Sequence, residues 1–249
     1  MNKLHIATYN LHKGFSSFNK RLTVHEQRNN LHQLDADIVF LQEVVGCHDK
    51  HAARYADWPD SGQHEFLADP LWPESVYGKN AVYESGHHGN AILSRYPIVC
   101  WENEDISAHR FESRGLLHCE INIPEWTENL HCICVHLGLF RKGRHAQLQA
   151  IKKRIKKLVP PRAPLVIAGD FNDWRNMTGS VVADALDLTE VFEYTHGRTA
   201  RSFPSALPLL RLDRIYVRGF HIADSRVHSH HSWSKTSDHA ALSTNVIRK

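Results

Sequence analysis

The chain has 249 residues, of which 42% are hydrophobic and 23% are charged, values that are ordinary for a soluble globular protein. This length is sufficient for one sizeable core, so we expect a single domain over residues 1–249. The formal net charge of +3 permits an anionic substrate without demanding nucleic acid.

The N-terminus and the cysteines indicate where the protein works. The first residues, MNKLHIATYN, have no signal-peptide pattern, and no run approaches about 20 apolar residues, which predicts no stable membrane insertion. Cys119, Cys132 and Cys134 lie in apolar, strand-like runs without C-x-x-C spacing, which predicts reduced, buried thiols. We therefore expect a cytoplasmic protein.

Short apolar runs separated by turn-forming residues predict a series of strands. Several runs are apolar at successive positions, which indicates strands that are buried on both faces. In chain order, the expected strands cover residues 4–9, 37–41, 90–94, 116–123, 130–135, 164–168, 212–217 and 240–247.

Helical patterns are fewer. Thr23 and Glu26 have capping-box spacing and predict a helix start before Leu31. A second helix is expected over residues 144–158 and a third over residues 179–187. The second helix has an apolar stripe made of Leu148, Ile151, Ile155 and Leu158.

Two stretches are open to more than one interpretation. The other face of the second helix is either a solvated face or a patch for an anionic partner. Residues 46–88 are expected to be mostly loop, and a loop of that length is more often functional than idle. The helix face carries Lys152, Lys153, Arg154, Lys156 and Lys157, and the loop carries Trp58, Trp72, Tyr77 and Tyr83.

Polar side chains follow or interrupt most of the expected buried strands. A single Asn or Asp at a strand end is usually a turn residue, but Glu and His are poorer turn formers. Repeated at several strand ends, this pattern predicts one rim where the strand ends converge on a cleft. The residues concerned are Asn10, Gln42, Glu43, His136, Asp170, Asn172, Asp213, Asp238 and His239.

The residue types at this rim favour metal-assisted phosphate chemistry. Oxygen ligands such as Glu43, Asn10 and Asp238 suit Mg²⁺, which keeps positions for water and phosphate. Imidazoles such as His136 and His239 can donate to phosphate oxygens as charge develops there.

Eight motifs in this order resemble the endonuclease/exonuclease/phosphatase superfamily, the DNase I-like group, and in particular its small bacterial members of unassigned substrate. The resemblance covers nearly the whole chain. The motifs are TYNLH (8–12), LQE (41–43), HGNAILS (88–94), SRG (113–115), VHLG (135–138), GDFN (169–172), LDRIYV (212–217) and SDH (237–239).

The resemblance implies a fold and a reaction. The fold is a four-layer α/β sandwich (α+β) of two packed, mainly antiparallel sheets flanked by helices. The reaction is Mg²⁺-dependent hydrolysis of a phosphate ester, with Mn²⁺ as a substitute ion. The resemblance further implies Glu43 as the principal metal ligand, supported by Asn10 and Asp238.

The resemblance also implies roles for the remaining rim residues. Asp170 activates the attacking water and is oriented by Asn172. His239 contacts the scissile phosphate and is paired with Asp213, which favours its charged form. The further implied phosphate-side groups are His136, Arg114 and Asn90.

The substrate is left open among three alternatives. A DNA- or RNA-directed nuclease is favoured by the basic helix, by the aromatic residues between 55 and 83, and by Arg141, Lys142 and Arg144. A phosphodiesterase for a phospholipid or a small phosphorylated molecule would use residues 46–88 as its specificity wall. An inactive binding module on the same fold is the third alternative, and no protein partner is implied.

Three smaller features are also ambiguous. His228, His230 and His231 either bind a transition metal or lie in a loop that shapes one wall of the cleft. Asp173 has no role implied by the resemblance and is interpreted as a turn or helix-start residue. Trp174 either stacks on a base or caps the core.

Overall fold

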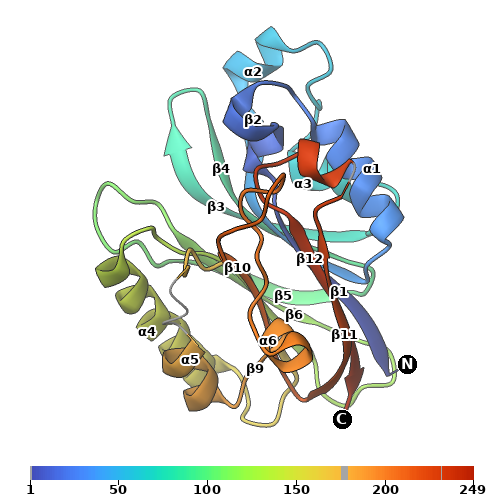
Figure 1. The fold of residues 1–249 in the computed structure, drawn as a ribbon, viewed down its shortest axis with the longest axis vertical. Helices are drawn as coiled ribbons and strands as arrows, with labels where there is room; N and C mark the ends of the chain where they lie inside the picture. The colour runs from blue at the N-terminus through green and yellow to red at the C-terminus, as the bar shows by residue number, and fades with distance from the viewer. Residues whose placement is uncertain (1, 175–178, 231) are drawn as a thin grey trace.

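A computed structural model describes residues 2–174, 179–230 and 232–249 of the chain. Two sheets pack face to face in the centre, and helices cover their outer faces (Figure 1). The arrangement has four layers, helix–sheet–sheet–helix, as expected from the sequence.

The first sheet contains both ends of the described chain, which lie close together at the lower right of Figure 1. Its strand order joins distant parts of the sequence, because the last strand pairs with the first. In spatial order it comprises β11 (Phe220–His228), β12 (Ala241–Arg248), β1 (Lys3–Asn10), β2 (Ile38–His48), β4 (Gly86–Ser94) and β3 (Glu74–Tyr83).

The second sheet is built from the middle of the chain. In spatial order it comprises β5 (Ile98–Asp105), β6 (Gly115–Ile121), β7 (Leu130–His136), β8 (Leu165–Asp170), β10 (Asp213–Arg218) and β9 (Thr189–Glu190).

Each sheet has one parallel pair at its centre among the described strands. β1 pairs with β2 in the first sheet, and β7 pairs with β8 in the second. The remaining pairings are antiparallel, so the prediction of mainly antiparallel sheets is confirmed. Parallel neighbours end at the same edge of a sheet, so the polar residues that follow each pair are brought together.

Helices on both sides bury the outer faces of the sheets. α1 (Val24–Leu34) and α3 (Gln63–Ala68) pack on the first sheet, while α4 (Arg141–Leu158) and α5 (Gly179–Leu186) pack on the second (Figure 1). The other helical elements are α2 (Asp49–Arg54), α6 (Val191–His196) and the 3₁₀ turns η1 (His12–Gly14), η2 (Ser17–Asn19) and η3 (Trp233–Lys235). Within the described residues, each helix is too short or too polar to cross a membrane.

The central core fills the space between the two sheets. It includes Phe40 from the first sheet and Ile215 from the second, both fully buried. Cys119, Cys132 and Cys134 are free and buried in this layer, which confirms the prediction of reduced core thiols. Burial also raises the pKa of the Cys134 thiol to about 12.

All eight predicted strands are present, with ends that differ by a few residues. Four further strands, β3, β5, β9 and β11, were not predicted. β3, β5, β9 and β11 lie at the sheet edges, and most of the β5 residues are exposed. An edge strand of this kind has no continuous apolar run, so the pattern that identifies buried strands does not detect it.

The prediction that residues 46–88 are mostly loop was wrong. The segment contains the end of β2, then α2 and α3, all of β3, and the start of β4. Two of its aromatic residues pack within the protein: Trp72 is buried and donates to the Ala36 carbonyl, and the Tyr77 ring stacks on His64. Helices of six residues are too short to show a clear helical period in the sequence.

The capping box predicted at Thr23 is not formed, although α1 begins at Val24 as expected. The Thr23 hydroxyl instead donates to the carbonyls of Gly14 and Thr236, so it connects the helix start to neighbouring segments. Glu26 forms an ion pair with Arg21. Tertiary partners therefore replace the local cap.

The second predicted helix is α4, and two of its residues differ from expectation. Leu158, assigned to the apolar stripe, is 41% exposed because the helix ends there. Arg154, assigned to the basic face, is buried and ion-paired with Glu102 and Glu104 at 2.6 and 2.8 Å. The third helix, α5, lies within its predicted range.

Gly169 is a position where the backbone geometry tolerates no side chain. Its φ is +143°, and a Cβ there would lie 2.0 Å from the Val135 carbonyl oxygen of the adjacent strand. We predict that Gly169→Ala lowers the free energy of unfolding by about 3 kcal/mol or more, measured by chemical denaturation.

Gly197→Ala is the matched control. Gly197 also has a positive φ, +68°, but a Cβ there has no neighbour within 4 Å. Its expected cost is the backbone strain alone, about 1–2 kcal/mol. Equal losses in the two variants would show that close approach to β7 is unimportant.

Candidate functional site

Strand register alone places three predicted site residues in one row. Asp170, at the end of β8, pairs with His136 of β7 on one side and with Asp213 of β10 on the other. His136 Nε2 lies 3.5 Å from Asp170 Oδ2, and the three side chains are buried. The row crosses the carboxyl end of the parallel pair in the second sheet.

His239 joins this row from the first sheet. It precedes β12, and its Nδ1 donates a hydrogen bond of 2.8 Å to Asp213 Oδ2. Its Nε2 is 3.8 Å from Asp170 Oδ2, so the ring lies between the two carboxylates. The predicted pairing of His239 with Asp213 is therefore present in the geometry.

Asn10 and Asn172 surround the Asp170 carboxylate with further donors. Asn10 Nδ2 donates to Asp170 Oδ2 at 3.2 Å, and the Asn172 backbone N–H donates to Asp170 Oδ1 at 2.9 Å. Asn172 has a φ of +50°, and its side-chain amide donates to the Leu137 carbonyl. This tight turn holds the backbone so that the Asp170 carboxylate accepts from several sides.

Glu43 reaches the cleft because β2 has a bulge. Leu41 pairs with Ala91 and Val44 with Gly89, so two residues of β2 oppose one residue of β4. Glu43 has a φ of +54° within this irregularity. A bulge redirects a side chain that regular alternation would place on the other face.

The net effect of burial and neighbouring charge is to raise the pKa of both Asp170 and His239. Burial, followed by the negative charge of Asp213, raises the pKa of Asp170 above its usual range. Burial opposes the charge on His239, but Asp213 outweighs it and raises the pKa of His239 to about 10. At neutral pH His239 is therefore a cation beside a carboxylate that is able to accept a proton.

His136 and Glu43 have the complementary charge states. Burial, with a smaller contribution from Arg114, lowers the pKa of His136 to about 3, so this imidazole is neutral at pH 7. Burial opposes the charge on Glu43, but the potential of His136, Lys13 and other cations lowers its pKa to about 2. With His136 neutral, positive charge near Glu43 at pH 7 comes from Lys13, whose Nζ is 3.6 Å from Glu43 Oε2, and from the His239 cation.

These side chains open on a pocket of about 390 Å³. One part of its wall is polar and carries the residues described above, and the other part is apolar. Trp174 is 42% exposed, so the interpretation that it caps the core was wrong. The lining residues are Lys13, Glu43, His88, Arg114, His136, Leu139, Asp170, Asn172, Trp174, Phe203, Leu210, Leu212 and His239.

Several lining residues were missed by the sequence analysis. Lys13 follows the TYNLH motif in a turn at φ +58°, and Phe203 reaches the pocket from a segment far from any motif. The Phe203 ring packs against the His239 ring at 5.1 Å between centroids. The sequence signal for Lys13 is its basic side chain directly after a motif. No sequence signal identifies Phe203.

Three predicted residues lie around the pocket with other partners. Arg114 lines it, with Nε 3.9 Å from Glu112. Asn90 lies behind the lining residues and donates to the Gly115 carbonyl at 3.0 Å, which joins the two sheets. Asp238 also lies outside the lining set, with Oδ2 3.3 Å from His12 Nδ1.

The donor set fits a hard divalent cation. Glu43 is ionised and faces the pocket, and Asn10 Oδ1 accepts only one described hydrogen bond, from the His12 backbone N–H. Ligand atoms of Asp170, Asp213 and His239 also lie within 4.8 Å of one another. Because His239 Nδ1 is bonded to Asp213, we interpret this second group as a proton relay rather than a metal centre.

Comparison with known proteins agrees with this geometry. A family model described as the Endonuclease/Exonuclease/phosphatase family matches residues 7–239. The chain belongs to this family. Members of the family are generally phosphoesterase hydrolases that use a divalent metal, and the motif resemblance found in the sequence is confirmed.

One similar relative is an uncharacterized protein, YbhP, of Escherichia coli strain K12. It is 45% identical over 241 residues, which cover 97% of this chain and 95% of the relative. A protein of the same name from Shigella flexneri shows the same identity and coverage.

Solved structures of the family share the fold. An endonuclease/exonuclease/phosphatase from Beutenbergia cavernae has a TM-score of 0.77 at 19% identity, covering all of this chain and 72% of that one. A mannosyl-6-phosphatase from Bacteroides thetaiotaomicron has a TM-score of 0.75 at 18% identity, covering 98% and 99%. A humanized D. rerio TDP2 has a TM-score of 0.71 at 20% identity, covering 98% of each chain.

The relay geometry predicts the charge of two site histidines. In the wild type, His239 keeps its proton until its pKa of about 10, and His136 is neutral above its pKa of about 3. In Asp213→Asn, burial remains while the carboxylate is lost, so we expect the pKa of His239 to fall below the ordinary histidine value of 6.5. Histidine side-chain NMR during a pH titration measures the pKa values of His239 and His136 in the wild type and in the variant.

The same shift predicts a pH dependence of stability. Because the folded-state pKa of His239 is raised, its protonation contributes to the free energy of unfolding. This contribution is fully present below pH 6.5 and is lost as pH rises toward 10. Asp213→Asn should weaken this loss, whereas Asp184→Asn, at an exposed position, should not. A His239 that titrates near 6.5 in the wild type would contradict the relay.

Proposed function

We propose that the protein hydrolyses a phosphodiester by in-line attack of a water that Asp170 activates. The observation that supports this most is the Asp170 carboxylate, which is buried, has a raised pKa, and lies between two imidazoles at the wall of the pocket. A general base works best when its pKa approaches the working pH.

The other groups would divide the remaining work. The His239 cation and Arg114 line the pocket and would neutralise charge that develops on the phosphate oxygens. Neutral His136 has an N–H to donate to a phosphate oxygen or to the leaving group. Glu43, with Asn10 and Asp238, would hold Mg²⁺ or Mn²⁺, which supplies Lewis-acid neutralisation of the phosphate.

For the substrate, a nuclease-like activity on DNA or RNA is our first candidate, on narrower grounds than the sequence suggested. Arg141 is at the end of α4 that is nearer the pocket, and Lys156 lies roughly 20 Å further along the helix. Most of the basic face therefore lies away from the pocket. Arg144 is buried, and it donates to the Leu139 carbonyl. The remaining support is Trp174 at the pocket and the exposed Arg141 nearby.

A phospholipid or small-molecule phosphodiester is the second candidate. The pocket wall includes Leu139, Leu210 and Leu212, and Leu139 and Leu210 are 54% and 41% exposed. Apolar side chains exposed at a catalytic pocket favour a substrate with an apolar group beside its phosphate. The segment 46–88, which we expected to form the specificity wall, contributes none of the described lining residues except His88.

Removing the proposed base tests the reaction. We predict that Asp170→Ala reduces turnover of bis-p-nitrophenyl phosphate by about 10²- to 10⁴-fold, while Asp184→Asn leaves it unchanged.

Wild-type activity should rise with pH through the raised pKa of Asp170, above the usual carboxyl value of about 4. It should fall when His239 loses its proton near its pKa of about 10.

Removing the proposed metal ligand tests the cofactor. EDTA should abolish turnover, and Mg²⁺ or Mn²⁺ should restore it. For Glu43→Gln, we expect the half-saturating Mg²⁺ concentration to rise about tenfold or more, because a carboxylate ligand is lost. Glu84→Gln, at an exposed position, is the control. Turnover that is unaffected by EDTA would refute metal dependence.

A substrate panel separates the candidates. Plain DNA, abasic DNA, RNA, phosphatidyl lipids and inositol phosphates are compared at one Mg²⁺ concentration. Cleavage of nucleic acid that weakens steeply with salt supports the first candidate, and preference for a lipid supports the second. No turnover of any substrate, with Asp170→Ala indistinguishable from the wild type, would favour an inactive binding module.

A further inference from the structure

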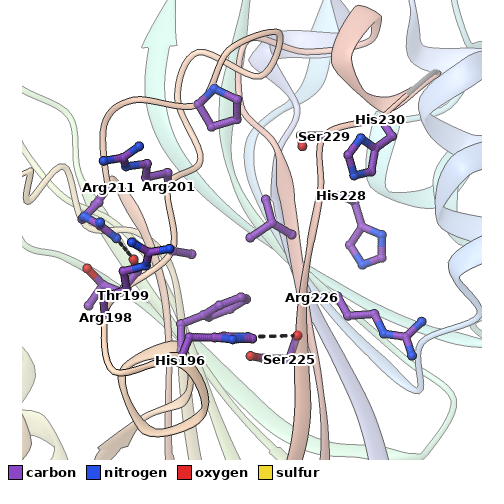
Figure 2. A pocket seen from close by; sticks show the side chains of 14 residues that line it. His196, Arg198, Thr199, Arg201, Arg211, Ser225, Arg226, His228, Ser229 and His230 are labelled. Atoms are coloured by element: carbon purple, nitrogen blue, oxygen red, sulfur yellow. Dashed lines mark hydrogen bonds between the residues drawn. The ribbon is translucent and has the colours of Figure 1, made fainter.

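A second cavity, of about 670 Å³, lies between the segment that precedes β10 and the end of β11. One wall is the segment from His196 to Arg211, and the opposite wall is the end of β11 with residues 229 and 230 (Figure 2). The pocket of about 390 Å³ that Asp170 and His239 line is here called the catalytic pocket. The second cavity shares no lining residue with it, and its size suits a small ligand or a substrate group.

Three arginines gather on one wall of this cavity. Arg198, Arg201 and Arg211, here called the arginine cluster, come from one segment and lie close to one another in Figure 2. Arg226 also lines the cavity, but its guanidinium extends away from the cluster on the far side of β11. The cluster therefore concentrates positive charge on one side of the cavity.

No carboxylate among the described residues compensates this charge. The cavity lining contains neither Asp nor Glu, and no described carboxylate lies within ion-pair distance of the cluster. Arg28, Arg95 and Arg154, elsewhere in the fold, are each paired with a carboxylate.

The guanidinium groups of the cluster repel one another. Burial, followed by the charges of Arg201 and Arg198, lowers the pKa of Arg211. The Arg211 guanidinium donates to the Thr199 backbone carbonyl, which fixes it against the wall. Arg198 and Arg201 are exposed, so water screens part of this repulsion, and a bound anion would relieve the rest. Phosphate oxygens match the guanidinium fork.

Apart from Arg226, the remaining lining supplies hydrogen-bonded and apolar side chains. His228 is hydrogen-bonded to Ser243, and burial lowers its pKa to about 4, so it is neutral at pH 7. His196 Nε2 donates to the Ser225 carbonyl (Figure 2). Phe192 and Val227 add apolar surface. One end of the cavity thus suits an anionic group, and the rest suits a less polar one.

The histidines at the end of β11 do not favour the metal site considered from the sequence. His228 Nε2 already has Ser243 as its partner, and His230 lines the cavity without a described carboxylate beside it. His231 lies outside the described residues. The alternative interpretation, a loop that shapes one wall of the catalytic cleft, was wrong, because His228 lies in β11 and both His228 and His230 line this second cavity instead.

The segment that carries the cluster also forms a wall of the catalytic pocket. Ser202 Oγ accepts a hydrogen bond from the Asp213 backbone N–H, and the Ser202 carbonyl accepts one from Ala240. Phe203, the next residue, packs on His239, and Leu212 follows Arg211 directly into the catalytic pocket. The cavity and the catalytic pocket therefore lie on two sides of one short segment.

We propose that the arginine cluster is an accessory phosphate site, which binds a second phosphate group of the substrate whose diester is cleaved in the catalytic pocket. This inference rests on the proposed function and narrows it to substrates that carry at least two phosphate groups. The segment from Ser202 to Leu212 separates the two phosphates and would lie under the part of the substrate that connects them.

A pair of substrates that differ by one phosphate tests the proposal. The p-nitrophenyl ester of thymidine 5′-phosphate is compared with the same ester bearing an additional 3′-phosphate, by release of p-nitrophenol. We expect the wild type to have a KM about tenfold lower for the second ester, the gain typical of one charge-assisted contact. Arg198→Gln/Arg201→Gln should remove this preference and leave kcat/KM for the first ester unchanged.

The matched control is Lys156→Gln/Arg162→Gln, which removes the same charge at two exposed positions. It should keep the preference, so a loss in the control as well would indicate long-range charge rather than a site. Equal KM values for the two esters in the wild type, or a preference that survives in Arg198→Gln/Arg201→Gln, would overturn the proposal.

A binding measurement separates this inference from the proposed function. Inorganic pyrophosphate is titrated calorimetrically into the metal-free wild type, Arg198→Gln/Arg201→Gln and Arg114→Gln. Binding that is lost only in the first variant supports the accessory site, even if the wild type hydrolyses neither ester. Binding that is lost only in Arg114→Gln belongs to the catalytic pocket and overturns the proposal.

Discussion

The rest of the site depends on two carboxylates that strand register forces together in a buried place. Asp170 and Asp213 stand opposite each other on β8 and β10, where burial and mutual repulsion disfavour two negative charges. His239 resolves the conflict by carrying a proton between them. The same conflict raises the pKa of Asp170, so the constraint that orders the site also gives Asp170 the pKa shift that suits the proposed base.

The site is held together by contacts between the two sheets. Asn10 from the first sheet bonds to Asp170 of the second, and His239, which precedes β12, bonds to Asp213. Behind them, Gln42 donates to Cys134 and Asn90 donates to the Gly115 carbonyl. Because a packed sheet interface deforms little, these links would keep the proposed metal ligands on the first sheet at a constant separation from the proposed base, Asp170, on the second.

Under the proposed function, the segment from Arg198 to Leu212 would contribute most to substrate choice. It positions Asp213 and His239 through Ser202 and Phe203, lines the catalytic pocket with Leu210 and Leu212, and carries the arginine cluster on its other side. Under the proposed function, the row of His136, Asp170 and Asp213 would suit any phosphodiester, so discrimination between substrates would come from surfaces such as this one. An anion on the cluster would reduce the repulsion that the segment bears in its absence.

Local patterns by themselves determined the buried strands, the polar residues at their ends and the family, because buried strands require apolar runs and phosphate chemistry requires a small set of side chains. Only the tertiary structure decided which of these residues meet. Register paired His136, Asp170 and Asp213, a bulge turned Glu43 to the cleft, and Gln42 and Asn90 became links between the sheets. The helices and edge strand within residues 46–88 were missed because they are short or exposed. Lys13, Phe203 and the arginine cluster come from turns and loops, whose side chains are placed by packing against distant elements rather than by any local period.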